Sequence, residues 1–421
     1  MQEQAGLAKD RSTSPPSDGQ GPRQQPIDAD DPVVRLLLSL CSWPRDRATI
    51  DADELADEQG WSRALTLVKL HGLIPILYAA QREGCLSRDI PDPDALRRAY
   101  YVQAARAALA LDELGDIAGA LSRHGVPCIV LKGAASMLSI YRDPAMRVLS
   151  DLDLLVHLDD LDQAVAALEG AGYRKVVTTT SREDEWLSVM YFDGISMYRG
   201  RNLPIELHCS FLGGIGDADQ AVSEAWERSV RLQLEGQALT ALCPEHAFIT
   251  AACHLYRNSH RSLPYMKDVA DLLLLAQQVD EREGWNRLRD TCRRWSVERE
   301  VHGVCAFINA YLPATVPLGS GNPPAFTPAD LAYALDRLEG RGRLTEGLAA
   351  RLRLIGRLPS WQARCRFLWG LIAPSKEFLR WRYRIRDGRS LAPYYARHVL
   401  KAVKRTTMDA VLRARQRRRY R

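Results

Sequence analysis

Apolar residues recur at helical spacing over most of the chain, and at strand spacing in one central stretch. Apolar positions three and four residues apart predict a helix that begins near Val33 and a long helix over 94–124. Pro93 suits the first turn of the helix over 94–124, and Gly125 suits the residue after its end. Beyond Cys209 the spacing is helical again. The pattern therefore predicts an α+β fold, a small mixed sheet with flanking helices embedded in a mostly helical chain.

Short apolar or alternating runs between residues 125 and 212 predict the strands of this sheet. We expect five of them, at 127–131, 151–156, 173–179, 190–199 and 203–209. Helices are expected at 134–141, 159–170 and 182–189, and then at 244–256, 265–278 and 285–312. The strands and helices of residues 125–212 thus alternate, which sets this stretch apart from the helical regions on either side of it.

Composition divides the chain into five regions. Residues 1–30 are rich in Gln, Ser, Pro and Asp, and too few large apolar side chains are present to offset the entropy of ordering, so we expect disorder there. An N-terminal helical region (31–124), the sheet-containing core (125–212) and a C-terminal helical domain (213–373) follow. The last region is a basic tail, residues 374–421.

Charge is unevenly distributed along the 421 residues. The net charge is +5, yet residues 373–421 alone carry 16 Lys/Arg and 3 Asp/Glu, so the rest of the chain is acidic. Such a tail suits an anionic partner, either nucleic acid or a membrane surface. A solvated terminal helix with a frayed end is the alternative, and it is the one favoured on the sequence.

Cysteine usage and hydropathy limit the class of protein. The nine cysteines are scattered and form no CxxC pair, which argues against a zinc ribbon or a disulfide framework and favours reduced thiols. The N-terminus lacks the apolar segment of a signal peptide, and no run of about 18 apolar residues predicts a transmembrane helix. We therefore expect a cytoplasmic location.

Two carboxylates mark the candidate site. In the run Ser150–Val156 the residues alternate, so Asp151 and Asp153 are expected on one face of a strand, where they repel each other unless a cation is bound. Hard carboxylate oxygens suit Mg²⁺. Gly133, after the preceding strand, suits close approach of backbone to phosphate. A metal-assisted phosphate site is one interpretation, and an exposed strand end with solvated acids is the other.

A later strand offers a third carboxylate. Glu206 and His208 are expected on one face of the strand over 203–209. Taken alone, a solvated edge-strand face explains them best. Together with Asp151 and Asp153, however, Glu206 would complete the acidic trio of a two-metal site.

These residues carry a family resemblance. The stretches concerned are Leu131–Ala135, Tyr141–Arg147, Asp151–Val156 and Ile205–His208. Together they resemble the bacterial uncharacterised nucleotidyltransferase family, which belongs to the polymerase-β-like nucleotidyltransferase superfamily. The resemblance spans roughly residues 94–278.

The resemblance implies both an activity and roles for particular residues. It implies transfer of a nucleoside monophosphate from an NTP such as ATP to an acceptor hydroxyl, with release of pyrophosphate. Two Mg²⁺ ions, or Mn²⁺ in their place, would be held by the catalytic carboxylates. The implied catalytic and metal-binding residues are Asp151, Asp153 and Glu206, and the implied nucleotide-binding residues are Lys132, Gly133, Ala134 and Arg147.

Other polar residues are weaker candidates for a functional role. His208 and His254 are candidates for substrate contact, and a structural role is the alternative for each. The helix ends around His254 are candidates of the same kind, with a solvated surface as the default; they carry Arg257, Asn258, Lys267, Asp268 and Asp271. Core packing is the expected role of Cys128 and Cys209, and a core or cap role that of His71.

Two further functions remain open on the sequence. A catalytically silent nucleotide-binding or scaffolding protein would keep the same fold without metal-dependent triphosphate binding. An RNA-directed transferase is supported only by the basic tail, since the sequence holds no recognisable RNA-binding module.

Overall fold

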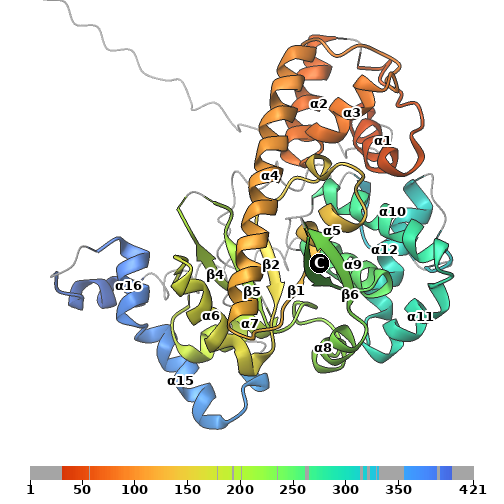
Figure 1. The fold of residues 1–421 in the computed structure, drawn as a ribbon. Helices are drawn as coiled ribbons and strands as arrows, with labels where there is room; N and C mark the ends of the chain where they lie inside the picture. The colour runs from red at the N-terminus through yellow and green to blue at the C-terminus, as the bar shows by residue number, and fades with distance from the viewer. Residues whose placement is uncertain are drawn as a thin grey trace, which may run out of the picture.

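The computed structural model describes residues 31–400, apart from gaps at 56, 178, 192–193, 201, 235, 261–264, 313–315, 320–322, 329, 331–354 and 386–388. The predicted disorder of residues 1–30 and the end of the basic tail fall outside the described residues. In Figure 1 a tall N-terminal helical part stands above a sheet, and a C-terminal helical part lies beside that sheet. The predicted α+β fold class is confirmed.

The strands form one mixed sheet in the order β3-β4-β5-β2-β1-β7-β6. Their bounds are β1 Ile129–Val130, β2 Leu152–Leu155, β3 Arg174–Lys175, β4 Ile195–Tyr198, β5 Ile205–His208, β6 Val230–Leu234 and β7 Gln237–Ala241. β2 runs parallel to β5 and antiparallel to β1, while β1 and β7 are parallel. The predicted strand pair around residue 200 is confirmed, because β4 and β5 are antiparallel neighbours. The first strand of the pair is shorter than the expected 190–199, because Met190 and Tyr191 are helical and β4 begins at Ile195.

Helices surround the sheet. Before and within it come α1 Pro32–Asp46, α2 Glu58–Leu70, α3 Ile74–Arg82, α4 Pro93–Arg123, α5 Lys132–Ser139, α6 Leu161–Gly170, α7 Arg182–Tyr191 and α8 Ala218–Glu227. After it come α9 Pro244–His260, α10 Met266–Glu281, α11 Trp285–Arg294, α12 Glu298–Tyr311, α15 Trp361–Ile372 and α16 Lys376–Tyr383. The long predicted helix is confirmed as α4, in which Asp92 caps the N-terminus by accepting from the Ala95 N–H, and Gly125 follows its end at a φ of +68°.

The sheet has two differently covered faces. Val130, Leu154 and Leu207 belong to an apolar cluster on the face that packs against α4 and α6. Ile129 and Leu155 point to the other face and join a second cluster with α1–α3 and α9–α12. Because side chains alternate along a strand, Asp153 shares the face of Leu155. The candidate site therefore lies between the sheet and the α9–α10 layer.

Three sequence expectations need correction. Residues 230–241, expected to be helical, form the hairpin β6–β7, which extends the sheet on its β1 side; Gly236 at its turn has a φ of +84°. The helix expected over 285–312 is two helices, because Ser296 takes a left-handed φ of +54°. The third strand is only two residues long. The five-region division of the chain stays a prediction.

Candidate active site

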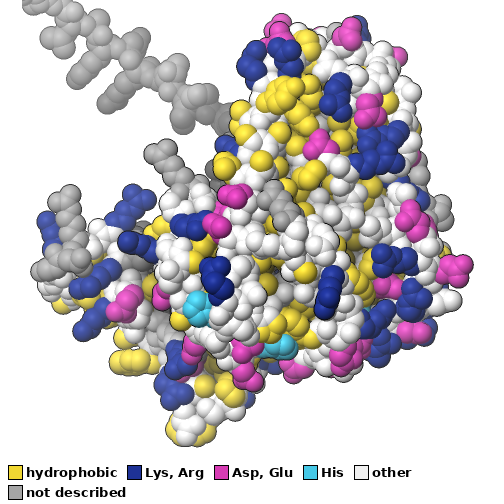
Figure 2. All heavy atoms as spheres, viewed as in Figure 1, with side chains coloured by type: hydrophobic (Ala, Val, Ile, Leu, Met, Phe, Trp, Pro, Cys, Tyr) yellow, Lys and Arg dark blue, Asp and Glu magenta, His cyan; other side chains and the backbone are white. Residues whose placement is uncertain are grey.

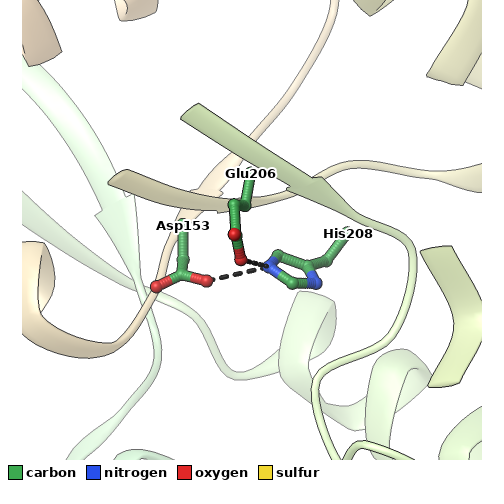
Figure 3. A group of neighbouring side chains, drawn as sticks. All are labelled: Asp153, Glu206 and His208. Carbon is green, nitrogen blue, oxygen red and sulfur yellow. Dashed lines mark hydrogen bonds and ion pairs between the residues drawn. The ribbon is translucent and has the colours of Figure 1, made fainter. Parts of the chain in front are cut away.

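Parallel pairing of β2 with β5 places Asp153 beside Glu206. The two residues are directly paired in the register, as are Leu155 and His208. Leu154 and Leu207 fill the opposite face, so the polar side chains of both strands must project toward the helical layer. Figure 3 shows the Asp153 and Glu206 carboxylates and the His208 ring converging from these neighbouring strands.

The three side chains form a compact cluster. His208 Nε2 lies 2.8 Å from Asp153 Oδ1 and 3.6 Å from Glu206 Oε2. One ligand atom from each residue lies within 4.8 Å of the other two. Asp153 and His208 are buried, while Glu206 is partly exposed and thus open to a ligand. This donor set could hold a divalent metal ion: its carboxylate oxygens suit Mg²⁺, and an imidazole nitrogen is a better ligand for softer ions.

Lys132 supplies a cation to this cluster. Its Nζ lies 2.6 Å from Asp153 Oδ1. Burial alone would lower the pKa of Lys132, but the Asp153 carboxylate outweighs burial and raises it. Burial would likewise raise the pKa of Asp153, yet Lys132 and His208 hold it well below its usual value. Asp153 is therefore a carboxylate and Lys132 an ammonium at neutral pH.

The turn after β1 differs from the sequence expectation. We expected a glycine turn at Gly133 and a helix from Ala134, but Lys132 is the residue in the left-handed region, with a φ of +49°, and helix α5 begins there. A Cβ on Gly133 would lie 2.8 Å from Leu149 Cδ2 and 3.3 Å from the Arg147 guanidinium. Gly133 thus serves close packing of the connector before β2. Ala134 is buried in the core.

Asp151 stands apart from the inner cluster. It precedes β2, and its Oδ1 accepts a hydrogen bond of 3.0 Å from Ser150 Oγ. Burial and the nearby charge of Asp153 raise its pKa. β2 begins at Leu152, so the expected placement of Asp151 and Asp153 on one face of a strand stays a prediction. The structure thus brings Asp153, Glu206 and His208 together and leaves Asp151 at the margin.

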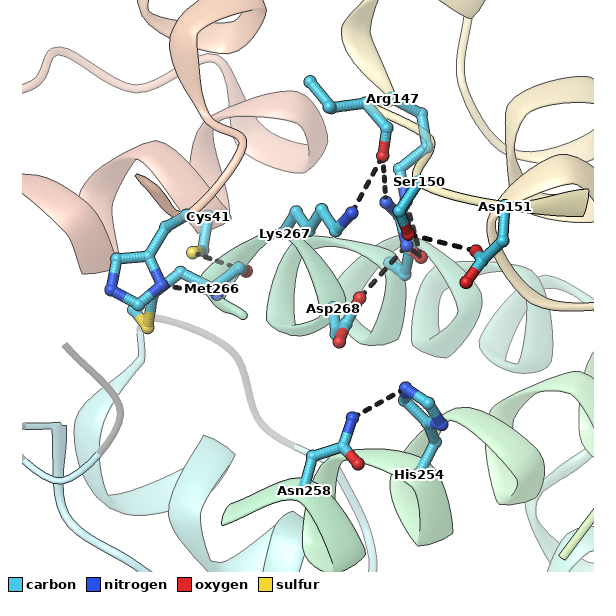
Figure 4. A network of polar contacts seen from close by, with 12 residues as sticks. Cys41, Arg147, Ser150, Asp151, His254, Asn258, Met266, Lys267 and Asp268 are labelled. Atoms are coloured by element: carbon cyan, nitrogen blue, oxygen red, sulfur yellow. Dashed lines mark hydrogen bonds and ion pairs between the residues drawn. The ribbon is translucent and has the colours of Figure 1, made fainter. Parts of the chain in front are cut away.

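Arg147 is held by buried carboxylates of α10. Its Nε donates to both carboxylate oxygens of Asp271 at 2.9 Å, and its Nη2 donates to Asp268 Oδ1 at 3.0 Å. Tyr141 also donates to Asp271. Figure 4 shows Arg147 directed at α10. These contacts favour a role in positioning the connector over the predicted triphosphate contact, because the Arg147 side chain is 6% exposed and its guanidinium donates on several sides.

Residues 57–313 match a family model described as "Uncharacterised nucleotidyltransferase". The match covers more than half of the 421 residues. The chain belongs to this family. Family membership makes the protein a nucleotidyltransferase, in agreement with the resemblance carried by its motifs.

The solved structures that the chain resembles are distant from it in sequence. A crystal structure of ANT(2")-Ia in complex with adenylyl-2"-tobramycin shares 16% identity at a TM-score of 0.33, over 44% of this chain and 96% of that one. A solution structure of ANT(2'')-Ia shares 15% identity at 0.33, over 46% and 95%. An antigenic nucleotidyltransferase-like protein from Paracoccidioides brasiliensis shares 14% at 0.28, over 46% and 92%. No curated protein matches the chain.

In this nucleotidyltransferase, α9 contributes a helical wall opposite the carboxylates. His254 is bonded through Nε2 to the Asn258 side-chain amide at 2.8 Å and through Nδ1 to Arg257 at 3.3 Å. Burial lowers the pKa of His254 well below its usual value, and the charges of Lys132 and Arg257 lower it further. His254 is therefore neutral, and α9 packs against α5, the helix that begins at Lys132. Figure 4 shows His254 and Asn258 side by side on this helix.

Two glycines of the nucleotidyltransferase allow close packing at the site, a role that the sequence did not predict. A Cβ on Gly213, which has a φ of +64°, would collide with the Arg257 guanidinium. A Cβ on Gly194, at a φ of +71°, would collide with the Leu207 carbonyl oxygen and lie 3.2 Å from His208 Nδ1. Both glycines therefore let the backbone approach a polar residue of the site. Their nearness in sequence to the Glu206 strand was the available signal.

His71, Cys128 and Cys209 take no part in the site. The His71 ring is buried, and its Nδ1 accepts from the Met266 N–H at 3.3 Å. Burial raises the pKa of both cysteine thiols, to about 11 for Cys128 and about 12 for Cys209, so neither is a thiolate at neutral pH. Core packing accounts for all three side chains, as the sequence indicated.

Proposed function

We propose that this nucleotidyltransferase moves a nucleoside monophosphate from an NTP to an acceptor hydroxyl in a Mg²⁺-dependent reaction. The observation that carries the proposal is the direct pairing of Asp153 with Glu206 on parallel strands, with the Lys132 ammonium on the same cluster. A solvated strand end does not bury one carboxylate and hold a lysine and a histidine against it.

The carboxylates fit a divalent metal ion. Asp153 and Glu206 would hold it, with Asp151 as a further ligand at the edge of the cluster. When bound, such an ion neutralises phosphate charge and lowers the pKa of the attacking hydroxyl. Mg²⁺ suits the carboxylates, and Mn²⁺ would also accept His208.

The remaining chemistry falls to groups of this chain. The acceptor oxygen forms a bond to the α-phosphorus, and the bond from that phosphorus to the bridging oxygen of pyrophosphate breaks. Glu206, the partly exposed carboxylate, accepts the hydroxyl proton, while His208 orients it from 3.6 Å. The first backbone N–H groups of α5 and the Lys132 ammonium face the charge of the leaving pyrophosphate.

The test is labelling of a metabolite extract with each of four α-labelled NTPs, in Mg²⁺, in Mn²⁺ and in a chelator. We expect a labelled product that requires metal and is lost about 100-fold or more in Asp153→Asn. Asp162→Asn is the matched control, because Asp162 is exposed and lies outside the site. Turnover by Asp153→Asn at the wild-type rate would contradict the proposal.

A metal-binding measurement separates the active enzyme from a catalytically silent protein. We expect Mg²⁺ with an NTP to raise the melting temperature of the wild type and of Asp162→Asn, but not that of Asp153→Asn. A silent scaffold would show no metal-dependent triphosphate stabilisation in any of the three proteins.

A further inference from the structure

Helix α15 carries apolar side chains on both its inner and its outer face. The inner face is fixed to the body: Phe367 is fully buried in a cluster with Leu187 of α7, and a Cβ on Gly370 would touch Ser181. Arg366 Nε also donates to Glu183 Oε1 at 2.6 Å. The orientation of α15 is therefore set, and so is the set of residues that it turns outward.

The outer face of α15 is apolar as well. Trp361 and Trp369 are 68% and 67% exposed, Ile372 is 55% exposed and Leu368 is 43% exposed. At 3.6 residues per turn, Leu368, Trp361 and Ile372 lie within about 40° of one another around the helix, and Trp369 lies about 60° further. We call these four residues the outer apolar face. In Figure 2 hydrophobic side chains are visible along the lower edge of the molecule, where Figure 1 places α15.

Basic residues flank this face on α15 and follow it in the sequence. Arg364 and Arg366 lie on either side of it on α15, and exposed Arg380, Arg382 and Arg384 follow in and just after α16. Dark-blue Lys and Arg side chains gather in Figure 2 near the place of α16. By sequence, residues 373–421 carry 16 Lys/Arg against 3 Asp/Glu. A tryptophan-bearing apolar face amid arginines is thus presented to the outside.

We propose that the outer apolar face and the basic residues beside it dock on an anionic lipid bilayer surface. Tryptophan favours the membrane–water interface, aliphatic side chains partition into the acyl boundary, and arginines attract acidic headgroups. A second copy of the chain fits less well, because pairing two such faces would bring two basic regions together. Nucleic acid would match the arginines and could stack on tryptophan, but it gives Leu368 and Ile372 nothing to pack against.

The docking is peripheral. Among the helices of the described residues, none is long and apolar enough to cross a bilayer. α15 is 12 residues long and packs on α7 by its inner face, so only its outer side chains would enter the headgroup region. An interface of this kind depends on both apolar contact and charge.

Co-sedimentation of the full chain with vesicles tests the proposal. The vesicles are pure phosphatidylcholine, or phosphatidylcholine partly replaced by phosphatidylglycerol. The variant is Trp361→Ser/Trp369→Ser, and the matched control is Tyr101→Ser/Leu109→Ser, which removes two comparably exposed side chains, 61% and 69%, from α4. Circular dichroism and the urea midpoint establish that each variant is folded.

We expect the wild type and the α4 control to bind phosphatidylglycerol vesicles, with binding weakened by salt. The tryptophan variant should bind about tenfold or more weakly. Equal binding by wild type and tryptophan variant, or equal binding to neutral and anionic vesicles, would overturn the proposal. Failure of the wild type to bind vesicles would also overturn it. In that case, single-stranded RNA binding lost in the variant would reassign the face to nucleic acid, and a dimer lost in the variant would reassign it to a second copy.

Discussion

Replacing Arg147 by Met tests whether this arginine positions the site or contacts the nucleotide. The guanidinium donates to Asp271 at 2.9 Å, to Asp268 at 3.0 Å and, through Nη1, to the Val148 carbonyl oxygen at 2.7 Å. The side chains of Arg147 and Asp271 are 6% exposed, and that of Asp268 is 12% exposed. Methionine would fill most of the volume of the arginine's alkyl chain, but it would leave the buried carboxylates of Asp268 and Asp271 without their cation.

The expected destabilisation follows from those contacts. Removing one partner of a buried ion pair costs about 3–5 kcal/mol, since the remaining charge is left without compensation. Burial raises the pKa of Asp268, and the Lys267 ammonium opposes that rise; Lys267 would therefore replace part of the lost charge, and we expect about 3 kcal/mol. Arg147→Lys keeps the charge but loses the planar double donation, and should cost about 1–2 kcal/mol. Arg147→Met with Asp271→Asn should recover part of the loss.

Urea unfolding at two pH values measures these effects. In Arg147→Met the stranded carboxylates hold their protons more tightly in the folded than in the unfolded chain. The penalty is therefore smallest at low pH and grows as pH rises through the raised folded pKa values. We expect the midpoint difference from wild type to be smaller at pH 5 than at pH 8.

The opposite result would refute the positioning role. If Arg147→Met unfolded at the wild-type midpoint but bound NTP weakly, the guanidinium would meet the triphosphate, as the family resemblance implies. Arg147→Lys should then bind NTP nearly as well as the wild type, because a phosphate contact needs mainly the charge.

Two further predictions concern other parts of the fold. Burial lowers the pKa of His246 to about 4 from its usual 6.5, so the unfolded chain binds a proton before the folded chain does as the pH falls. The free energy of unfolding should therefore fall by about 2 kcal/mol between pH 8 and pH 5. Urea midpoints measure this change, and His246→Phe should abolish it. Gly194→Ala would force a Cβ against the Leu207 carbonyl oxygen at a left-handed φ, and should lower stability by about 2 kcal/mol or more, whereas Gly170→Ala, at a site with open space, should leave the midpoint unchanged or slightly raised.

The pattern of neighbouring residues was enough to assign two of the carboxylates to strands and to predict much of the fold. Asp153 and Glu206 could be assigned to strands because alternation is a property of a few consecutive residues, and α4 because its cap and its periodicity are local. The hairpin β6–β7 was missed because its membership in the sheet depends on pairing with β1, about a hundred residues earlier.

Partners distant in sequence decided what local pattern could not. Arg147 precedes the Asp pair, where a phosphate contact is a natural expectation. Its actual partners lie 121 and 124 residues later, on α10. Asp268 and Asp271 were expected, by default, at a solvated helix end, yet their separation by one helical turn lets both carboxylates reach a single guanidinium. Only tertiary packing distinguishes these two readings.

Lys132 shows what the site demands of the backbone. A left-handed conformation costs a non-glycine residue about 1–3 kcal/mol, and the chain places its glycine one position later, at Gly133, where packing against Leu149 leaves no room for a Cβ. A glycine at 132 would relieve the strain but would remove the ammonium that lies 2.6 Å from Asp153. Stability alone does not explain a strained lysine at position 132, because a glycine there would be more stable. The strain is explained if the ammonium must lie beside the carboxylates before the substrate binds. A cation that is already in place needs no reorganisation when negative charge develops on the phosphate.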